Sequence, residues 1–327
     1  MVLALFLLTA ALGLVSTPIV RSLAFRLGVV DHPGPRKVHA SPVPRLGRLA
    51  VAVAASLGLA IVAVAASSLG WEAVAPNGEL TPILAGAALV LVIGIIDDIR
   101  WVPAWAKLLV ESMAALIVIR SGVVVDHATI AGHTYMFGVF TVPITLVWIL
   151  TITDAFNLMD GLDGLSSGLA VIASTTCVVI LLARGHRAEA LLLVAVVGAL
   201  VGFLPYNFQP ASIFLGDAGS LLIGFLLGVT AIAGFQKVAT TLAVGLPLMI
   251  FALPLLDVIA SVIRRATRAS SQNVSFREAF LHLFQADRGH IHHRLIGRGF
   301  SHRGAVLMLY LVAILFSSLA LLTFQGA

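Results

Sequence analysis

Apolar segments long enough to cross a bilayer recur along the whole chain. A helix needs about 20 predominantly apolar residues to span the hydrocarbon region of a membrane. Of the 327 residues, 60% are hydrophobic and only 11% are charged, whereas soluble domains carry about 25% charged residues. Such a chain cannot hide its side chains in one soluble core. We therefore expect an all-α, polytopic integral membrane protein whose single domain covers residues 1–327.

Ten segments are expected to be transmembrane helices, and the loops between them differ in charge. The segments are 2–20, 49–69, 80–96, 104–121, 137–155, 163–183, 188–204, 214–234, 238–262 and 304–324. Of the 20 Lys and Arg residues, 16 lie in one alternate set of loops, which comprises 21–48, 97–107, 157–164, 205–217 and 264–303. Because positively charged loops remain in the cytoplasm, we predict that this set is cytoplasmic and that both termini are extracytoplasmic. These loops, rather than a nucleic-acid partner, explain the basic composition.

Carboxylates gather on the predicted cytoplasmic side, in three separate loops or at their helix ends. They are Asp97, Asp98, Asp160, Asp163 and Asp217, with Asp154 and Asp257 just inside the same boundary. Carboxylates that converge repel each other unless cations lie among them. We therefore expect a divalent metal ion or basic side chains to form part of a site at this face.

The segment TDAFNLMDGLDGLSSG places Asp154, Asn157, Asp160 and Asp163 three residues apart. On a helix or a helical turn, this spacing keeps the four side chains on roughly one face. Such oxygen-rich groups suit a hard cation such as Mg²⁺, which keeps waters and substrate phosphates among its ligands. A polar helix cap at the water interface is the alternative, but a cap explains one Asp and not four polar groups in register.

A second acidic segment, YNFQPASIFLGDAGS, places Asp217 among small residues at the start of a predicted span. Capping of that helix and binding of a metal or anion at its start are equally favoured by these residues. Asn207 follows Pro205 closely and could orient a ligand or cap a turn.

Two cytoplasmic loops are basic. In HIHHR, His290 and His293 would share one face of a helix beside Arg294, with His292 pointing elsewhere. Phosphate binding fits these donors better than zinc binding does, because only Asp287 lies nearby as a further zinc ligand. A solvated basic face is the alternative.

The first loop, DHPGPRKVHASPVPRLGRLA, carries Lys37, His39, Arg45 and Arg48 and is stiffened by four prolines. It is a candidate lid over a polyanion. In the IIDDIRW segment, Asp97 and Asp98 differ by about 100° around a helix, so one can face a ligand while the other binds a neighbour.

Acids suited to a metal and cations suited to phosphate thus occur on one predicted face. This pairing is typical of phosphoryl transfer, in which positioning and charge neutralisation do most of the work. Because the face lies where lipid meets cytosol, one substrate is expected to be a lipid and the other a soluble phosphorylated compound. A cation- or proton-coupled transporter is the main alternative, but the acids lie at one interface and no inverted repeat is evident.

Five motifs in order resemble those of the polyprenyl-phosphate N-acetylhexosamine-1-phosphate transferases, and they are KVHASPVPRLGR, IIDDIRW, NLMDGLDGL, NFQPASIFLGDAGS and HIHHRL. The resemblance covers nearly the whole chain. HIHHRL is similar to the branch that loads GlcNAc-1-phosphate onto undecaprenyl phosphate. The phospho-MurNAc-pentapeptide translocase, whose histidine-rich segment differs, is the alternative within this group.

The resemblance implies that a polyprenyl phosphate oxygen attacks the β-phosphorus of a UDP-N-acetylhexosamine and that UMP is released. It also implies dependence on Mg²⁺, with Mn²⁺ as a substitute, and a homodimer in the inner (plasma) membrane whose active site faces the cytoplasm. The reaction would be the first membrane step of a cell-envelope polysaccharide, such as lipopolysaccharide or teichoic acid.

The same resemblance assigns roles to the acidic motifs. Asn157 and Asp217 match the metal ligands, and Asp97 matches the acid proposed to deprotonate the lipid phosphate, with Asp98 in support. A phosphate monoester is already mostly dianionic near neutral pH, because its second pKa is ~6. We therefore expect the metal to contribute more to the reaction than the general base does.

The remaining roles concern the sugar nucleotide. Asp160 and Asp163 match residues assigned to its binding or to catalysis. The segment near its phosphates comprises His290, His292, His293 and Arg294, and Lys37 and Arg45 lie in the basic first loop. The chain departs from the pattern at Arg48, where the family often shows a second glycine, and it ends after the tenth predicted helix, where some members carry an eleventh.

Overall fold

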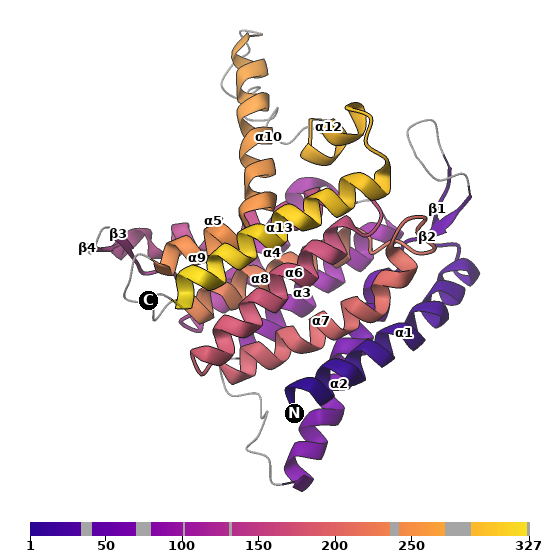
Figure 1. Cartoon of the computed structure of the whole chain (residues 1–327), viewed down its shortest axis with the longest axis horizontal. Helices are drawn as coiled ribbons and strands as arrows, with labels where there is room; N and C mark the ends of the chain where they lie inside the picture. The colour runs from indigo at the N-terminus through magenta and orange to yellow at the C-terminus, as the bar shows by residue number, and fades with distance from the viewer. Residues whose placement is uncertain are drawn as a thin grey trace.

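The computed structural model describes residues 1–33, 41–69, 80–100, 102–130, 133–235, 242–271 and 289–325. Within these ranges the chain is mainly helical. Its helices are α1 (Val2–Arg26), α2 (Gly47–Leu69), α3 (Leu80–Ile99), α4 (Ala104–Arg120), the 3-10 helix η1 (Gly138–Phe140), α5 (Thr141–Leu158), α6 (Leu165–Ala183), α7 (Arg187–Asn207), α8 (Asp217–Phe235), α9 (Leu242–Ile250), α10 (Ala252–Ser271), α12 (Ile291–Gly297) and α13 (His302–Gln325). Most of them pack side by side in one bundle, from which α10 projects (Figure 1).

Two short antiparallel hairpins mark the two ends of this bundle. One pairs β1 (Val30–Asp31) with β2 (Val43–Pro44), and the other pairs β3 (His127–Ile130) with β4 (His133–Met136). Figure 1 shows the first hairpin at the end of the bundle where α1 finishes and the second at the opposite end. The hairpins therefore serve as landmarks for the two sides of the molecule.

Eight helices in the described part of the chain are long and apolar enough to cross a membrane. They are α1, α2, α3, α5 together with η1, α6, α7, α8 and α13. The predicted helical, multi-pass architecture is confirmed at this level. The predicted span 104–121 corresponds to α4, which has 17 residues and is shorter than the other spans.

The predicted span 238–262 is not one continuous helix in its described part. α9 ends at Ile250 and α10 begins at Ala252. Pro254 has no N–H to donate to the carbonyl of Ile250, and a proline ring clashes with the carbonyl four residues before it. The helix is therefore interrupted at Phe251, and α10 leaves in a new direction (Figure 1).

The centre of the bundle is formed by α6, α7 and α8. In their spans 72%, 83% and 89% of the residues are buried, against 22% in α1 and 39% in α2. The outer helices expose large apolar side chains, such as Leu3, Val64 and Leu311. Such faces are suited to lipid, so the burial pattern agrees with a bundle in a membrane.

Candidate active site

Asp97 and Asp217 are brought together by a close contact between α3 and α8. Gly94 of α3 lies against Ala218, and a Cβ atom on Gly94 would lie only 2.1 Å from the Ala218 Cβ. Asp97 lies about one turn after Gly94, and Asp217 immediately precedes Ala218 at the start of α8. Because residue 94 is a glycine, the two helices approach closely enough for these two acidic residues to become neighbours.

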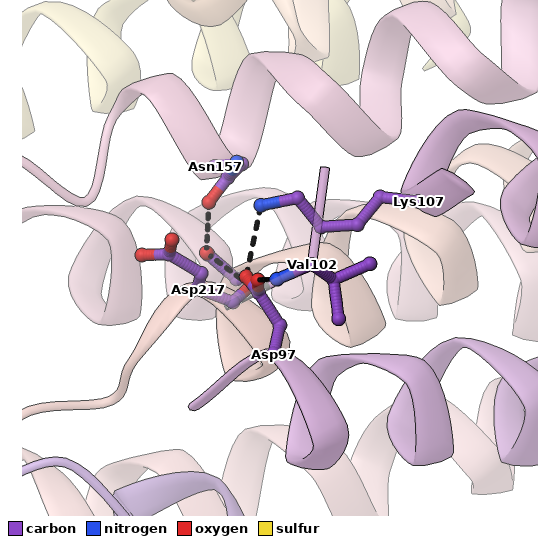
Figure 2. A network of polar contacts seen from close by, with 6 residues as sticks. Asp97, Val102, Lys107, Asn157 and Asp217 are labelled. Carbon is purple, nitrogen blue, oxygen red and sulfur yellow. Dashed lines mark hydrogen bonds and ion pairs between the residues drawn. The ribbon is translucent and has the colours of Figure 1, made fainter. Parts of the chain in front are cut away.

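Asn157 joins them through a second close contact, between α5 and α8. A Cβ atom on Gly224 would lie 2.8 Å from the Cα atom of Thr153. One turn from this contact, Ser220 Oγ lies 3.0 Å from Asn157 Oδ1 and 2.9 Å from the backbone carbonyl oxygen of Asp217, so its hydroxyl can donate to either. Figure 2 shows Asn157, Asp217 and Asp97 near one another at the ends of these three helices, with the Asp217 carboxylate directed away from that of Asp97.

The carboxylate of Asp97 is held by two donors. The backbone N–H of Val102 donates to Oδ1 at 2.9 Å, and Lys107 Nζ donates to Oδ2 at 2.8 Å (Figure 2). Lys107 also interacts electrostatically with Glu111 and Asp154. A basic side chain thus lies among the carboxylates, as the charge argument from the sequence required. The side chain of Asp98 lies outside the described residues.

The other two acids of the predicted metal segment lie in turns and not on a helix. α5 ends at Leu158, so Asp160 and Asp163 follow the helix that carries Asn157, and the N–H of Asp160 donates to the Asn157 carbonyl at 3.1 Å, as in a helical turn. Asp163 Oδ2 accepts a hydrogen bond of 3.0 Å from the backbone N–H of Ala211, which joins this turn to the segment before α8. Burial, followed by the charges of Asp217 and Asp163, raises the pKa of the Asp160 carboxyl well above its usual range. A cation bound here would favour the ionised carboxylate.

The basic first loop is attached to the segment that leads into Asp217. The backbone N–H of Phe214 donates to the carbonyl of Pro44 at 2.8 Å, and the N–H of Gly47 donates back to the Phe214 carbonyl at 3.0 Å. The N–H of Arg48 donates to the Leu215 carbonyl at 3.2 Å. These bonds place the end of the loop directly beside the start of α8.

The loop contributes two cations to the described structure. The Arg45 guanidinium forms an ion pair with Asp31 across the β1–β2 hairpin. Arg48 is fully buried, at 0% exposure, and interacts electrostatically with Asp217 and Asp97. Arg48 is therefore a second cation among the site carboxylates. Lys37 lies outside the described residues.

Asn207 forms an internal link in the protein. It is buried at the end of α7, where its Oδ1 accepts a hydrogen bond of 2.8 Å from Ser167 and its Nδ2 donates to the Ile213 carbonyl at 3.1 Å. Of the two roles considered from the sequence, this geometry favours holding a turn.

The histidine segment contacts the acidic turn through His292. α12 begins at Ile291, and a Cβ atom on Gly161 would lie 2.3 Å from His292 Nε2. Burial, followed by the charges of His293 and His290, lowers the pKa of the His292 imidazole to about 4, so the ring is neutral at pH 7. His293 and Arg294 are exposed. His292, which was expected to point away from the other histidines, is thus the one that packs against the turn between Asp160 and Asp163.

Two polar residues near the site were missed by the sequence reasoning. Ser220 links Asn157 to Asp217, and its signal was a position three residues after Asp217 on one face of α8. Glu111 is buried near Lys107. Its position four residues after that lysine on α4 indicates that the two side chains share one face of the helix.

The donor set suits a magnesium ion that shares its coordination with substrate. Among the described residues, no group of three or more His, Cys, Asp or Glu side chains is arranged to hold a metal. Mg²⁺ does not require one, since it keeps several waters and binds through one or two carboxylates plus substrate phosphates. The exposed carboxylate of Asp217 and the amide oxygen of Asn157 are hard oxygen donors on adjacent helices and fit this mode.

Comparison with known proteins assigns the chain to a family. The profile of a family described as Glycosyl transferase family 4 matches residues 80–235. A probable undecaprenyl-phosphate N-acetylglucosaminyl 1-phosphate transferase of Bacillus subtilis is 36% identical over 314 residues, which cover 95% of this chain and 82% of that protein. The chain belongs to glycosyl transferase family 4. The family predicted from the five motifs is confirmed.

Further relatives cover the chain to a similar extent. A decaprenyl-phosphate N-acetylglucosaminephosphotransferase of Mycolicibacterium smegmatis is 36% identical over 94% of this chain and 79% of its own length. An undecaprenyl-phosphate alpha-N-acetylglucosaminyl 1-phosphate transferase of Escherichia coli K12 is 27% identical over 92% of this chain and 78% of its own. The family 4 profile spans Asp97, Asn157 and Asp217, and the full-length relatives extend the similarity beyond it on both sides.

Proposed function

We propose that this family 4 protein transfers GlcNAc-1-phosphate from UDP-GlcNAc to a polyprenyl phosphate, such as undecaprenyl phosphate, and releases UMP. The observation that carries the proposal is the meeting of Asp97, Asn157 and Asp217, from three helices, at one end of a membrane bundle. The relatives named above use undecaprenyl or decaprenyl phosphate and N-acetylglucosamine 1-phosphate. Their names favour GlcNAc transfer over the translocase of phospho-MurNAc-pentapeptide.

In this reaction one diphosphate is exchanged for another. An oxygen of the lipid phosphate attacks the β-phosphorus of the sugar nucleotide, the bond from that phosphorus to the bridging oxygen breaks, and UMP leaves with the electron pair. Asn157 and Asp217 would hold Mg²⁺, or Mn²⁺ in its place, which when bound neutralises charge on the diphosphate and on the departing UMP.

Asp97 would take the proton of a lipid phosphate that arrives as the monoanion. Its carboxylate is oriented by Lys107 and by the Val102 N–H, so it cannot rotate freely. The contribution of this base is modest near neutral pH, because a phosphate monoester has a second pKa of ~6 and is largely dianionic there. Asp98 supports Asp97 in this proposal.

The sugar nucleotide is proposed to lie between the acidic turn and the histidine segment. Asp160 and Asp163 line the turn, and His292 packs against Gly161 between them. The side chains proposed to surround the diphosphate are His290, His292, His293 and Arg294, together with Lys37 and Arg45 of the first loop. Arg is suited to this task because its planar guanidinium binds phosphate oxygens through two parallel hydrogen bonds.

We further propose the setting of the reaction. The chain would cross the inner (plasma) membrane about ten times, with both termini outside and the site facing the cytoplasm, because 16 of the 20 Lys and Arg residues lie in the loops on that side. A homodimer is the proposed assembly. The lipid-linked sugar would start a cell-envelope polysaccharide of the lipopolysaccharide or teichoic acid type.

The proposal is tested by measuring UMP release from the purified protein in detergent with polyprenyl phosphate and Mg²⁺. We expect release with UDP-GlcNAc, slower release with UDP-GalNAc, none with UDP-MurNAc-pentapeptide, and loss of activity on chelation that Mg²⁺ restores. Absence of UMP release by folded protein with every donor, combined with cation flux in proteoliposomes, would support the transporter alternative instead.

A further inference from the structure

The carboxylate of Asp257 holds the histidine segment by two hydrogen bonds. Asp257 lies in α10 and is fully buried, at 0% exposure. Its Oδ2 lies 2.7 Å from Nδ1 of His290, and its Oδ1 accepts a hydrogen bond of 2.8 Å from the backbone N–H of Ile291. One side chain thus fixes both a ring and the first residue of α12.

A second contact ties the same two parts of the chain together. Gly289 lies against Arg264, and a Cβ atom on Gly289 would lie 2.4 Å from Arg264 Nε. Asp257 and Arg264 are seven residues apart, about two turns along one face of α10. α10 therefore serves as a support for the segment that starts at Gly289, although most of this helix projects from the bundle (Figure 1).

The support extends from α10 to the acidic turn. The rings of His290 and His292 are parallel within 4° and their centroids are 5.7 Å apart. His292 in turn touches Gly161, which lies between Asp160 and Asp163. The order of contacts is therefore Asp257, His290, His292 and then the turn. A change in how Asp257 holds His290 must shift the histidines relative to this turn.

The chemistry of the pair also fixes the hydrogen on the His290 ring. A carboxylate only accepts hydrogen bonds, so Nδ1 of His290 carries the hydrogen and Nε2 is the nitrogen left for another partner. An asparagine at position 257 keeps the volume but offers one acceptor and one donor. Its single oxygen cannot accept from both the Ile291 N–H and the Nδ1–H of His290, so the His290 ring must either lose this bond or move its hydrogen to Nε2.

We propose that Asp257 is a positioning residue for the sugar nucleotide, acting through His290 on the arrangement of the histidine segment against the acidic turn. This inference rests on the proposed function. It assigns to α10 a task in donor recognition, since the helix that carries Asp257 would itself touch neither substrate.

The test compares Asp257→Asn with Asp126→Asn, a matched control. Asp126 forms the same kind of pair with His127, at 2.6 Å, beside the β3–β4 hairpin at the far end of the bundle. We expect Asp257→Asn to raise the KM for UDP-GlcNAc about tenfold, the effect of losing one charge-assisted hydrogen bond from the displaced histidine segment to the diphosphate, and to leave the KM for polyprenyl phosphate unchanged. Asp126→Asn is expected to change neither constant.

Variants of His290 test whether Asp257 acts through the His290 side chain. His290→Asn retains a donor where Nδ1 lies, whereas His290→Ala does not. If Asp257 acts through His290, Asp257→Asn adds nothing to His290→Ala, because residues that act as a unit are non-additive. Equal rises in both KM values, or a further loss in the double variant, would overturn the inference and leave Asp257 a general stability residue.

Thermal unfolding with and without UDP-GlcNAc tests donor binding without requiring turnover. The rise in Tm that UDP-GlcNAc causes is expected to shrink in Asp257→Asn and to persist in Asp126→Asn. An unchanged rise in Asp257→Asn would refute the positioning role. Failure of the unmodified protein to release UMP would instead refute the proposed function, while this binding comparison would still decide the inference.

Discussion

Arg48 is a cation placed where a helix disfavours one. It lies in the first turn of α2, whose N-terminus carries a partial positive charge. Its side chain is fully buried and interacts electrostatically with Asp217 and Asp97. A buried charge without such compensation is strongly destabilising, so Arg48 and the two carboxylates stabilise one another. This residue gives the site a permanent positive charge that is present before any metal ion binds.

Replacing Arg48 should therefore have a metal-dependent effect on stability. We expect Arg48→Met to lower the Tm in EDTA by at least about 4 °C, because the site carboxylates are left without their cation. Mg²⁺ should recover part of the loss. Thermal unfolding in detergent with and without Mg²⁺ measures both, and the exposed Arg120→Met is the control. Equal losses in the two buffers would contradict this account.

Asp217 and Asp97 should differ in how much activity they control. We expect Asp217→Ala to abolish UMP release, whereas Asp97→Asn leaves activity that rises from pH 6 to pH 8 as the lipid phosphate becomes dianionic, since its second pKa is ~6. The pH profile of kcat/KM for both variants is the measurement. An equal and pH-independent loss in the two variants would speak against metal binding as the larger contribution.

His292 should make the fold sensitive to acid. Its pKa is lowered to about 4 in the folded protein, whereas an unfolded histidine has a pKa of ~6.5. Between these values the unfolded chain binds more protons, so stability is complete above pH 6.5 and falls as the pH approaches 4. The loss should reach roughly 3 kcal/mol. We expect Tm to fall less from pH 7.5 to 4.5 in His292→Gln, and parallel curves for His292→Gln and the exposed control His133→Gln would contradict this.

At the scale of helices, the contacts of α8 determine which residues meet. α8 carries Asp217 at its start and presents Ala218 to α3 and Gly224 to α5. Each contact lies about one turn from a polar residue of the partner helix, Asp97 in α3 and Asn157 in α5. The small residues therefore let the helices pack closely, and this packing sets the distance between the polar side chains of the site.

A methyl group at Gly94 should disrupt this arrangement. We expect Gly94→Ala to reduce kcat/KM for UMP release at least about 100-fold, because misplacement of site groups by about 1 Å has effects of that size. Gly245→Ala in α9 is the control, since a Cβ there has no neighbour within 4 Å. Activity of Gly94→Ala equal to that of Gly245→Ala would show that the contact with Ala218 does not set the distance between the site groups.

Prediction from the sequence succeeded for features that depend on a short stretch of residues, such as apolar segments and helix starts. The long apolar runs predicted eight spans that the described residues contain, and Asp217 does begin a helix. The three-residue spacing did not indicate that α5 would end at Leu158, because this spacing suits a helix and a helical turn equally. Prediction failed at Phe251, because the hydropathy of a segment does not report the break that Pro254 causes at the carbonyl of Ile250. The partners of Asp97 and His290 depend on tertiary packing, which periodicity does not report.

At the scale of the whole molecule, sidedness is the property to verify. The chain has one cysteine, Cys177, and it is buried, so Cys177→Ala provides a background without cysteine. In that background we expect Arg184→Cys to react with a membrane-impermeant maleimide in intact spheroplasts, and Arg298→Cys to react only after permeabilisation. The reverse pattern would place the site on the outer side and contradict the proposed orientation.

The acidic residues and the histidine segment lie at the same end of the bundle as the β1–β2 hairpin. A sugar nucleotide that enters from the water at that end consequently yields a lipid-linked sugar on the same side of the membrane. Because the reaction breaks one diphosphate linkage and forms another, its standard free-energy change is expected to be small. Its direction in a living cell would then be governed by whichever later machinery carries the glycolipid away or hydrolyses the nucleotide by-product.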